Sequence, residues 1–441
     1  MVPALAACGG NRDDCLYVLL ALQANIHEHL VCARMALKSA GLPEQHRSAR
    51  YAKRAANARV RELSEAGDLG GALELARVHA RANEHTAAAL LAGVSNRSSI
   101  RKCLHFALDG GCLRGRGSVA FSVLASSAAC AHARAGEPIQ ACAQVLSLRE
   151  LCWKECGCGL GEGALAAALS ALARSDDVRP RERDQYALAL LRAATEDSVA
   201  SASLFTITLQ ATRCKPKHWE SIRNLLNRAQ PPPDPQLLAL CVKASSLAGD
   251  DGSAMEMSCS SVADVFVGNA YMSTLSRRHK SRTARKLWHS MARFERDHYT
   301  VSAALSAAAK CADEDLGEDV LQWIEDRGLL MEHNEHTATA AVAYMGSVGS
   351  WQRAIALVER FVYERGMREP VCSAGLRALA QSGQLKRALR LFEEMQNSGI
   401  LPSRRTFDAL LPALELAGYC ESAFQLRQLK RSLRTLKELY R

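Results

Sequence analysis

The fold is decided by Asp264–Lys310, which reads DVFVGNAYMSTLSRRHKSRTARKLWHSMARFERDHYTVSAALSAAAK. Its apolar residues recur at intervals of three and four, which predicts one helix, a turn around Arg277–Lys280, a second helix and the first helix of a further unit. The same unit recurs along much of the chain. We therefore predict a repeat array, whose function resides in a repeated surface and not in a single pocket.

The composition favours an all-α fold. Hydrophobic residues make up 48% of the 441 residues and aromatic residues only 5%, so the apolar content is mostly small and aliphatic. Alanine is the strongest helix former, and small side chains suit thin seams between helices. We expect a superhelical solenoid of stacked helix-turn-helix repeats.

The repeats are aligned on a turn residue, often glycine, followed five residues later by a small residue, usually alanine. The pattern occurs at Gly67/Ala72, Gly136/Ala141, His279/Ala284, Gly349/Ala354, Gly383/Ala388 and Gly418/Ala423. Counting back fifteen residues gives unit starts at Ala52, Asn83, Phe121, Asp234, Asp264, Asp297, Asn334, Arg368 and Ser403. With two less regular units between Ser170 and Gln230, roughly eleven units are expected.

Three regions are expected along the chain. Residues 1–51 form an N-terminal helical lead-in, either a degenerate repeat or the remnant of a presequence. Residues 52–233 hold degenerate helical hairpins, and residues 234–441 hold clearer repeats that end in a terminal capping helix. The best copy is Arg368–Pro402, in which Gly383 separates two helices and Gly399 ends the second.

The quoted unit resembles the pentatricopeptide repeat family. DVFVGNA followed by TARKLWHSM and RFERD is similar to the subgroup that mixes long and short repeats, and Arg387–Leu414 resembles the standard 35-residue form. The resemblance implies an RNA-binding solenoid in which each repeat reads one base of a single strand with two or three side chains.

The resemblance also implies which residues read bases: one position inside the first helix and the first residue of the next repeat. Asn269 with Asp297 matches the pairing for uracil, Ser302 with Asn334 that for adenine, and Asn57 with Asn83 a pyrimidine pair. Thr339 with Arg368 and Ser373 with Ser403 depart from the usual combinations, and Asp408 lacks a clear partner. Val265 fits the apolar residue that flanks the base. An alternative is that Asp264 and Asp297 are simply helix N-caps.

Basic residues supply candidate phosphate contacts. The net charge is +10 at pH 7, and each neutralised phosphate would make binding more sensitive to salt. The cluster expected to contact phosphates is Arg277, Arg278, Lys280, Arg282, Arg285 and Lys286. A solvated helical face is the plain alternative for such a run.

The sequence contains only incomplete versions of motifs for catalytic, metal-binding or cofactor-binding sites. His218-Trp219-Glu220 mimics half of a zinc deaminase motif without its cysteine pair, and Cys152, Cys156 and Cys158 lack a second ligand pair at a defined spacing. Gly157–Ala164 contains G-x-G-x-x-A, but no strand precedes it. We expect no enzymatic activity, no metal, no cofactor, no small-molecule substrate and no membrane span.

Our leading hypothesis is sequence-selective binding of single-stranded RNA, as the resemblance implies for organellar RNA processing, stability or translation, including mRNA processing, alongside other RNA-processing proteins. Two rivals stay open: a protein-binding scaffold of the tetratricopeptide kind and a structural subunit of a ribonucleoprotein assembly. The resemblance implies a mitochondrion or plastid. Asp13 and Asp14 argue against an N-terminal transit peptide, so the cytoplasm stays open as well.

Overall fold

The computed structural model describes residues 47–439 apart from short gaps at 79–82, 110–112, 114–116, 233, 261–262, 294–295 and 328–333. Over this range the chain forms twenty-two α-helices, α4 to α25, arranged as eleven consecutive hairpins. The predicted all-α fold is therefore confirmed. The predicted lead-in of residues 1–51 lies almost entirely outside the described residues.

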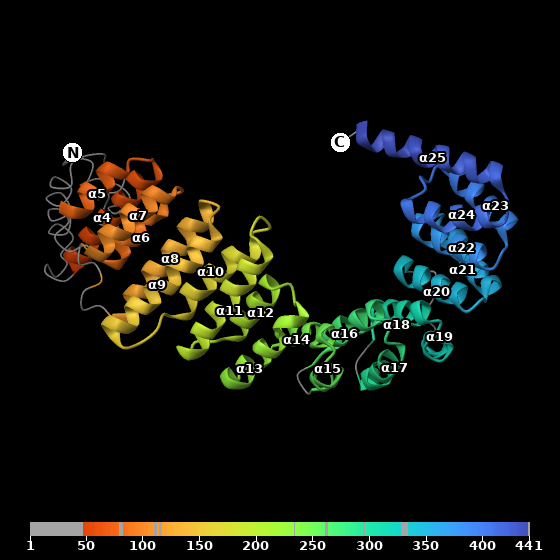
Figure 1. The fold of residues 1–441 in the computed structure, drawn as a ribbon, viewed down its shortest axis with the longest axis horizontal. Coiled ribbons are helices and arrows are strands. Elements are labelled where there is room, and N and C mark those ends of the chain that lie inside the picture. Colours follow the sequence, from red (N-terminus) through yellow and green to blue (C-terminus); the bar gives the residue numbers. More distant parts are fainter. Residues whose placement is uncertain are drawn as a thin grey trace, which may run out of the picture. The chain divides into compact units, whose positions relative to one another are not determined.

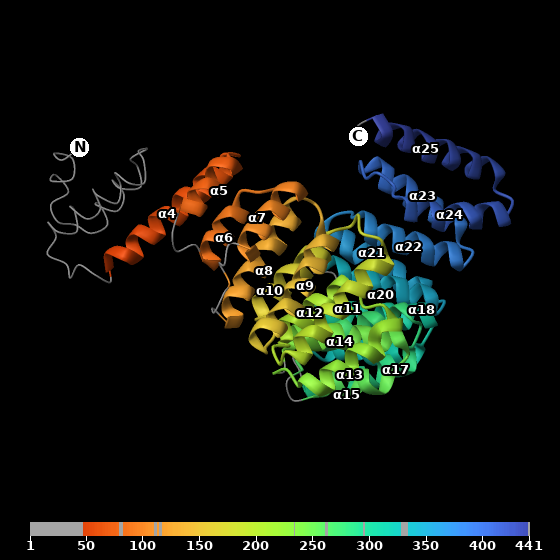
Figure 2. The same ribbon diagram turned by 60° about the vertical axis from the view of Figure 1, so that its left-hand side comes forward.

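The chain divides into two compact units. Met1–Arg213 and Glu220–Pro232 form one unit, and Cys214–Trp219 and Pro233–Arg441 form the other. The helices of the N-terminal unit are α4 (Arg47–Glu65), α5 (Leu69–Val78), α6 (Glu84–Ala92), α7 (Arg97–Asp109), α8 (Gly117–Arg134), α9 (Pro138–Cys156), α10 (Glu162–Arg174), α11 (Pro180–Glu196), α12 (Ala202–Ala211) and α13 (Trp219–Ala229). Figures 1 and 2 both show α8, α10 and α12 lying side by side.

The C-terminal unit is the more regular of the two. Its helices are α14 (Pro235–Ala248), α15 (Asp251–Ser258), α16 (Val265–Arg277), α17 (Ser281–Ser290), α18 (His298–Cys311), α19 (Glu314–Asp326), α20 (Glu335–Ser347), α21 (Trp351–Arg365), α22 (Glu369–Gln381), α23 (Leu385–Asn397), α24 (Arg404–Leu416) and α25 (Cys420–Leu439). The first helices of consecutive hairpins pack on one another in the order α14, α16, α18, α20, α22, α24. They form one layer, and the second helices form the other.

The predicted register is confirmed at the unit starts. Seven of the predicted starts are the N-cap residues of first helices, namely Asn83, Asp234, Asp264, Asp297, Asn334, Arg368 and Ser403. The predicted starts at Ala52 and Phe121 are wrong, because α4 already begins at Arg47 and α8 at Gly117.

The turn residues explain how each hairpin closes. Gly383 has φ +70° and His279 has φ +56°, so both adopt the left-handed conformation that ends a helix. The small residue five positions later is fully or almost fully buried at each predicted turn, as at Ala388 and Ala284, both 0% exposed. An alanine there lets the second helix lie close against the first.

Small residues also set the distance between first helices. A Cβ added at Gly346 on α20 would lie only 2.6 Å from Cβ of Ala378 on α22. That distance is too short for two methyl groups, so the helices could not keep their present separation. The distance between α20 and α22 at this point therefore depends on the absence of a side chain at Gly346.

We therefore expect Gly346→Ala to lower the free energy of unfolding by about 1–3 kcal/mol, because the extra methyl overpacks the seam. Gly252→Ala is the matched control, since a Cβ at Gly252 in α15 meets nothing within 4 Å. Urea unfolding followed by circular dichroism measures both. Equal stability of the two variants would show that the seam tolerates a wider spacing.

Candidate functional site

The junction between α16 and α18 brings together two of the predicted base-reading residues. Asn269 Nδ2 donates to both carboxylate oxygens of Asp297, at 3.1 Å and 3.3 Å. A third residue, Thr300, joins them: its hydroxyl lies 2.6 Å from Asn269 Oδ1 and 2.8 Å from Asp297 Oδ1. The three side chains form one hydrogen-bonded cluster drawn from two consecutive hairpins.

Asp297 is also a helix N-cap. Its Oδ1 accepts the backbone N–H of Thr300 at 2.7 Å, and Thr300 completes a capping box. The capping interpretation and the pairing with Asn269 are therefore compatible, because one carboxylate serves both. Partial burial raises the pKa of Asp297, but the hydrogen bonds from Thr300 and Asn269 outweigh it, and the net pKa lies below the usual range.

The same cluster recurs in the N-terminal unit between α4 and α6. Thr86 donates its hydroxyl to Asn57 Oδ1 at 2.7 Å and to Asn83 Oδ1 at 3.1 Å. Asn83 caps α6 and forms a capping box with Thr86. The predicted pair Asn57 and Asn83 is thus joined through a threonine that stands three residues after the cap, as Thr300 does.

A hydroxyl pair occupies the junction between α18 and α20. Ser302 Oγ lies 3.3 Å from Thr337 Oγ1. Because Ser302 donates its proton to the His298 carbonyl at 2.7 Å, Thr337 is the donor between the two hydroxyls. Asn334 caps α20 through the N–H groups of His336 and Thr337. This places the predicted pair Ser302 and Asn334 on either side of Thr337.

The junction between α22 and α24 contains an additional carboxylate. Ser373 and Thr406 lie 2.7 Å apart, and both donate to Glu369 Oε1, at 2.5 Å and 2.9 Å. Burial raises the pKa of Glu369, but hydrogen bonds from Ser373, Ser403 and Thr406 outweigh it and the net pKa is lowered. The hydroxyl protons of this junction are therefore directed toward Glu369.

The two other predicted positions are arranged differently. Thr339 donates to the Glu335 carbonyl in its own helix at 2.7 Å. The residue that corresponds to Thr300 in the following repeat is Val371, which has no hydroxyl to offer. Asp408 forms ion pairs with Lys430 at 3.0 Å and Arg404 at 3.3 Å.

Exposed aromatic rings lie beside the predicted base-reading positions, one residue after the position predicted for the base-flanking apolar residue, Val265. Val265 is partly buried, whereas its neighbour Phe266 is 58% exposed. Tyr299 and His336 are the equivalent residues of the next two repeats, and both are exposed. Three aromatic rings thus stand in register, each three residues before Asn269, Ser302 or Thr339. Their common offset from the cap residue is the signal in the sequence that would have found them.

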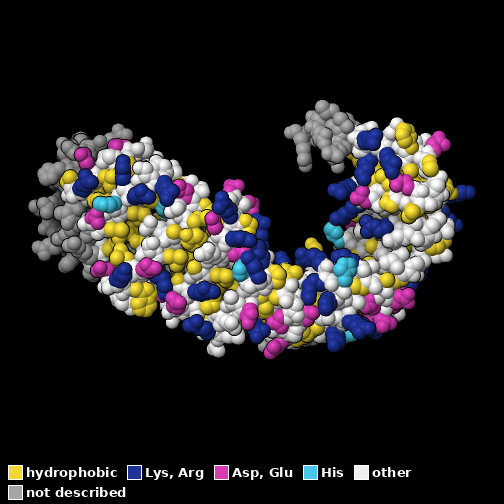
Figure 3. All heavy atoms as spheres, viewed as in Figure 1, with side chains coloured by type: hydrophobic (Ala, Val, Ile, Leu, Met, Phe, Trp, Pro, Cys, Tyr) yellow, Lys and Arg dark blue, Asp and Glu magenta, His cyan; other side chains and the backbone are white. Residues whose placement is uncertain are grey.

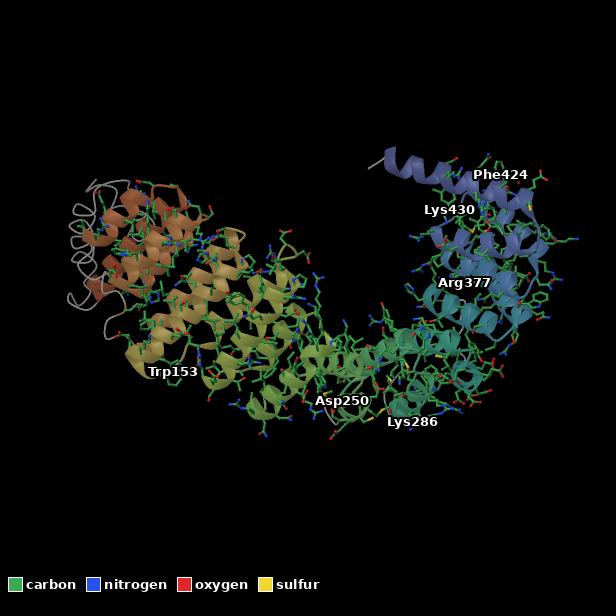
Figure 4. The ribbon with its side chains drawn as sticks, viewed as in Figure 1. Trp153, Asp250, Lys286, Arg377, Phe424 and Lys430 are labelled. Carbon is green, nitrogen blue, oxygen red and sulfur yellow. The ribbon has the colours of Figure 1, made fainter. Side chains whose placement is uncertain are left out.

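The predicted basic cluster separates into paired and exposed side chains. Arg278 pairs with Asp251 at 2.6 Å, and Arg285 pairs with Asp315 at 2.5 Å and Asp319 at 3.1 Å. The exposed members are Arg277, Lys280, Arg282 and Lys286. Lys286 belongs to α17, in the layer of second helices (Figure 4).

Other basic side chains lie closer to the reading positions. Arg377 is exposed one helical turn after Ser373 on α22, and Lys430 of α25 contacts Asp408. Figure 3 shows Lys and Arg side chains gathered on the side of the C-terminal unit where Figure 4 labels these two residues. Lys310 and Arg277 are exposed in the last turns of α18 and α16.

The other motifs have structural roles. Trp219 is buried and its Nε1 donates to Asp250 at 3.0 Å. Gly157 ends α9 with φ +67°, so the glycine-rich stretch is a turn between helices. Burial raises the pKa of Cys152 to about 12, which keeps its thiol protonated. Within the described ranges no group of three or more His, Cys, Asp or Glu is placed to hold a metal ion, and no helix is long and apolar enough to cross a membrane.

Similarity to known proteins was found at the level of sequence and of structure, although no protein-family model matches the chain. A pentatricopeptide repeat-containing protein of Arabidopsis thaliana is 30% identical over 126 residues, which is 29% of this chain and 23% of the relative. Over that stretch the chain is similar to a pentatricopeptide repeat-containing protein. The matched stretch therefore spans less than a quarter of the length of that relative.

Solved structures of one pentatricopeptide repeat protein are also similar. PPR10 in complex with an 18-nucleotide psaJ RNA element is 17% identical, with a TM-score of 0.48 over 96% of this chain and 62% of PPR10. PPR10 from maize, in a second structure, is 13% identical, with a TM-score of 0.43 over 99% of this chain and 70% of PPR10.

The lowered pKa of Asp297 gives a testable prediction about stability. The Asp297 carboxylate stabilises the fold above its unfolded pKa of about 4, and this contribution is lost as the pH falls through the lower folded pKa. Asp297→Asn keeps a capping side chain but removes the charge. We expect the variant to be less stable than the parent at pH 7 and the difference to shrink in acid. Urea midpoints at several pH values measure it, and a difference independent of pH would contradict the assignment.

Proposed function

We propose that this chain binds single-stranded RNA in a sequence-selective way, with one base read at each junction between consecutive first helices. The observation that carries the proposal is the recurrence of one polar cluster, built at the same register, at the junctions of Asn57, Asn269, Ser302 and Ser373. Amide and hydroxyl groups supply donors and acceptors that match the Watson–Crick edge of an unstacked base.

The exposed rings support a single strand as the ligand. Phe266, Tyr299 and His336 recur once per repeat beside the reading positions. Bases of a single strand can stack on such rings, whereas the bases of a duplex are already stacked. A separation of one repeat between rings suits one nucleotide per repeat.

Phosphates provide the remaining affinity. Lys310 and Arg277 are exposed in the last turns of α18 and α16, and Arg377 is exposed one turn after Ser373 on α22. Arg278 and Arg285 already neutralise carboxylates, so of the predicted cluster we assign a phosphate contact to Arg277 on α16. The exposed Lys280, Arg282 and Lys286 cap or belong to α17, in the layer of second helices. Binding should therefore weaken as salt is added.

The specific assignments follow from the family resemblance. We propose uracil for Asn269 with Asp297, adenine for Ser302 with Asn334 and a pyrimidine for Asn57 with Asn83. We also propose that the protein acts without chemistry of its own in the processing, stability or translation of mitochondrial or plastid transcripts. Crosslinking in cells followed by sequencing of the bound RNA would identify the compartment and the transcripts.

The base assignment is tested with Asn269→Ser. We expect the preference at one base of the bound RNA to shift from uracil toward guanine, because the hydroxyl replaces an amide beside Asp297. Binding is measured with short RNAs varied one base at a time. A parent protein that binds no RNA at low salt, or that binds duplex DNA equally well, would contradict the proposed function.

Stacking is tested separately with Phe266→Ala. Loss of one stacked base should weaken RNA binding by about 1–3 kcal/mol, or about five- to 150-fold. The matched control is Tyr363→Ala, which removes an exposed ring (88% exposed) from α21 in the layer of second helices. Equal losses in the two variants would show that the row of rings is not the stacking surface.

A further inference from the structure

The junction clusters contain one residue that the base-reading pair does not explain. Thr86, Thr300, Thr337 and Thr406 each stand three residues after the cap of a first helix, and each is at most 3% exposed. A buried hydroxyl is costly unless it forms hydrogen bonds, so its presence needs a reason. Each of these hydroxyls reaches the reading residue of the preceding repeat.

Other repeats show that an apolar residue fits the same place. Val267 and Val371 occupy this register in α16 and α22, and both are 0% exposed. Val267 follows a repeat whose reading position is the buried Ala239. Val371 follows Thr339, which donates to its own helix. Packing alone therefore does not require a threonine, and the hydroxyl occurs where a reading side chain accepts or shares its proton.

The hydroxyl decides which atoms of the reading residue face outward. In the α16–α18 junction, Thr300 is held at Asn269 Oδ1 while Asn269 Nδ2 points to Asp297. The amide is thereby fixed against a 180° flip, which would exchange its donor and its acceptor. Since a base edge is recognised by the order of donors and acceptors, a flipped amide would present a different pattern.

The same reasoning applies to hydroxyl reading residues. Thr337 donates to Ser302, whose own proton is held by the His298 carbonyl. Ser373 is held through a shared acceptor, because Ser373 and Thr406 both donate to Glu369 Oε1. In both cases the protons of the reading hydroxyl are directed into the protein, and lone pairs are left for a ligand.

We propose that Thr300, with its equivalents Thr86, Thr337 and Thr406, is a specificity-determining positioning residue, which sets base preference by fixing the orientation of the reading side chain. The inference rests on the proposed RNA-binding function and adds to it a third residue per junction. It also accounts for the junction of Thr339, where the threonine is replaced by Val371 and base selection is expected to be weak.

The test uses the full chain and a randomised single-stranded RNA pool, from which bound sequences are selected and read. Thr300→Val removes the hydroxyl at nearly constant volume, and Thr300→Ser restores it. We expect Thr300→Val to lower discrimination about three- to tenfold, as for one lost hydrogen bond, at the single base whose preference Asn269→Ser shifts. Thr300→Ser should retain the preference of the parent.

The matched control is Thr274→Val. Thr274 is equally buried, but its hydroxyl donates to the Ala270 carbonyl within α16 at 2.9 Å. This variant should change stability without changing base preference. If Thr300→Val does not fold, Thr337→Val gives the same readout at the neighbouring base.

Three results would overturn the inference in distinguishable ways. An unchanged base profile in folded Thr300→Val, with the parent selecting RNA normally, would refute the positioning role alone. A parent that enriches no sequence from the pool would refute the proposed function and the inference together. Loss of preference in Thr274→Val as well would show a general effect of stability.

Discussion

The structure depends on the close packing of one first helix against the next. A single hairpin cannot bury its apolar stripe, so each unit is stable only when neighbours cover it. Small residues at the seams, such as Gly346 against Ala378, decide how near the helices come. That distance also determines whether Thr300 on α18 can reach Asn269 on α16. The polar junctions are therefore a consequence of the apolar packing.

Helix capping and the proposed base recognition use the same atoms in this chain. Asp297 satisfies the first-turn N–H groups of α18 and at the same time accepts the amide of Asn269. Because the cap fixes the backbone, the carboxylate is held rigidly before any ligand arrives, which reduces the entropy lost on binding. The lowered pKa of Asp297 keeps it an acceptor at neutral pH. A side chain that caps a helix, such as Asp297, can thus also belong to the proposed base-reading site.

Much of the fold could be predicted from the sequence, because the turn glycines and cap residues are local signals. Seven unit starts matched N-caps, whereas Ala52 and Phe121 fall inside α4 and α8, which begin at Arg47 and Gly117. The pairs around Asn269 and Asn57 followed from the family resemblance. The bridging threonines did not, since a buried Thr near a helix start is indistinguishable from core. The ion pairs of Arg278 and Arg285 join residues from different helices and become visible only in three dimensions.

The division of each reading cluster between two hairpins has a consequence for engineering. Asn269 belongs to one repeat, and Asp297 and Thr300 belong to the next. A whole hairpin transplanted from cap to cap would carry the front half of one cluster and the back half of another, and would disturb two contacts at once. The self-contained unit of exchange is instead the segment from Asn269 to Thr300, which begins and ends inside first helices. The segments proposed to read one base each therefore do not coincide with the helical hairpins in which the chain folds.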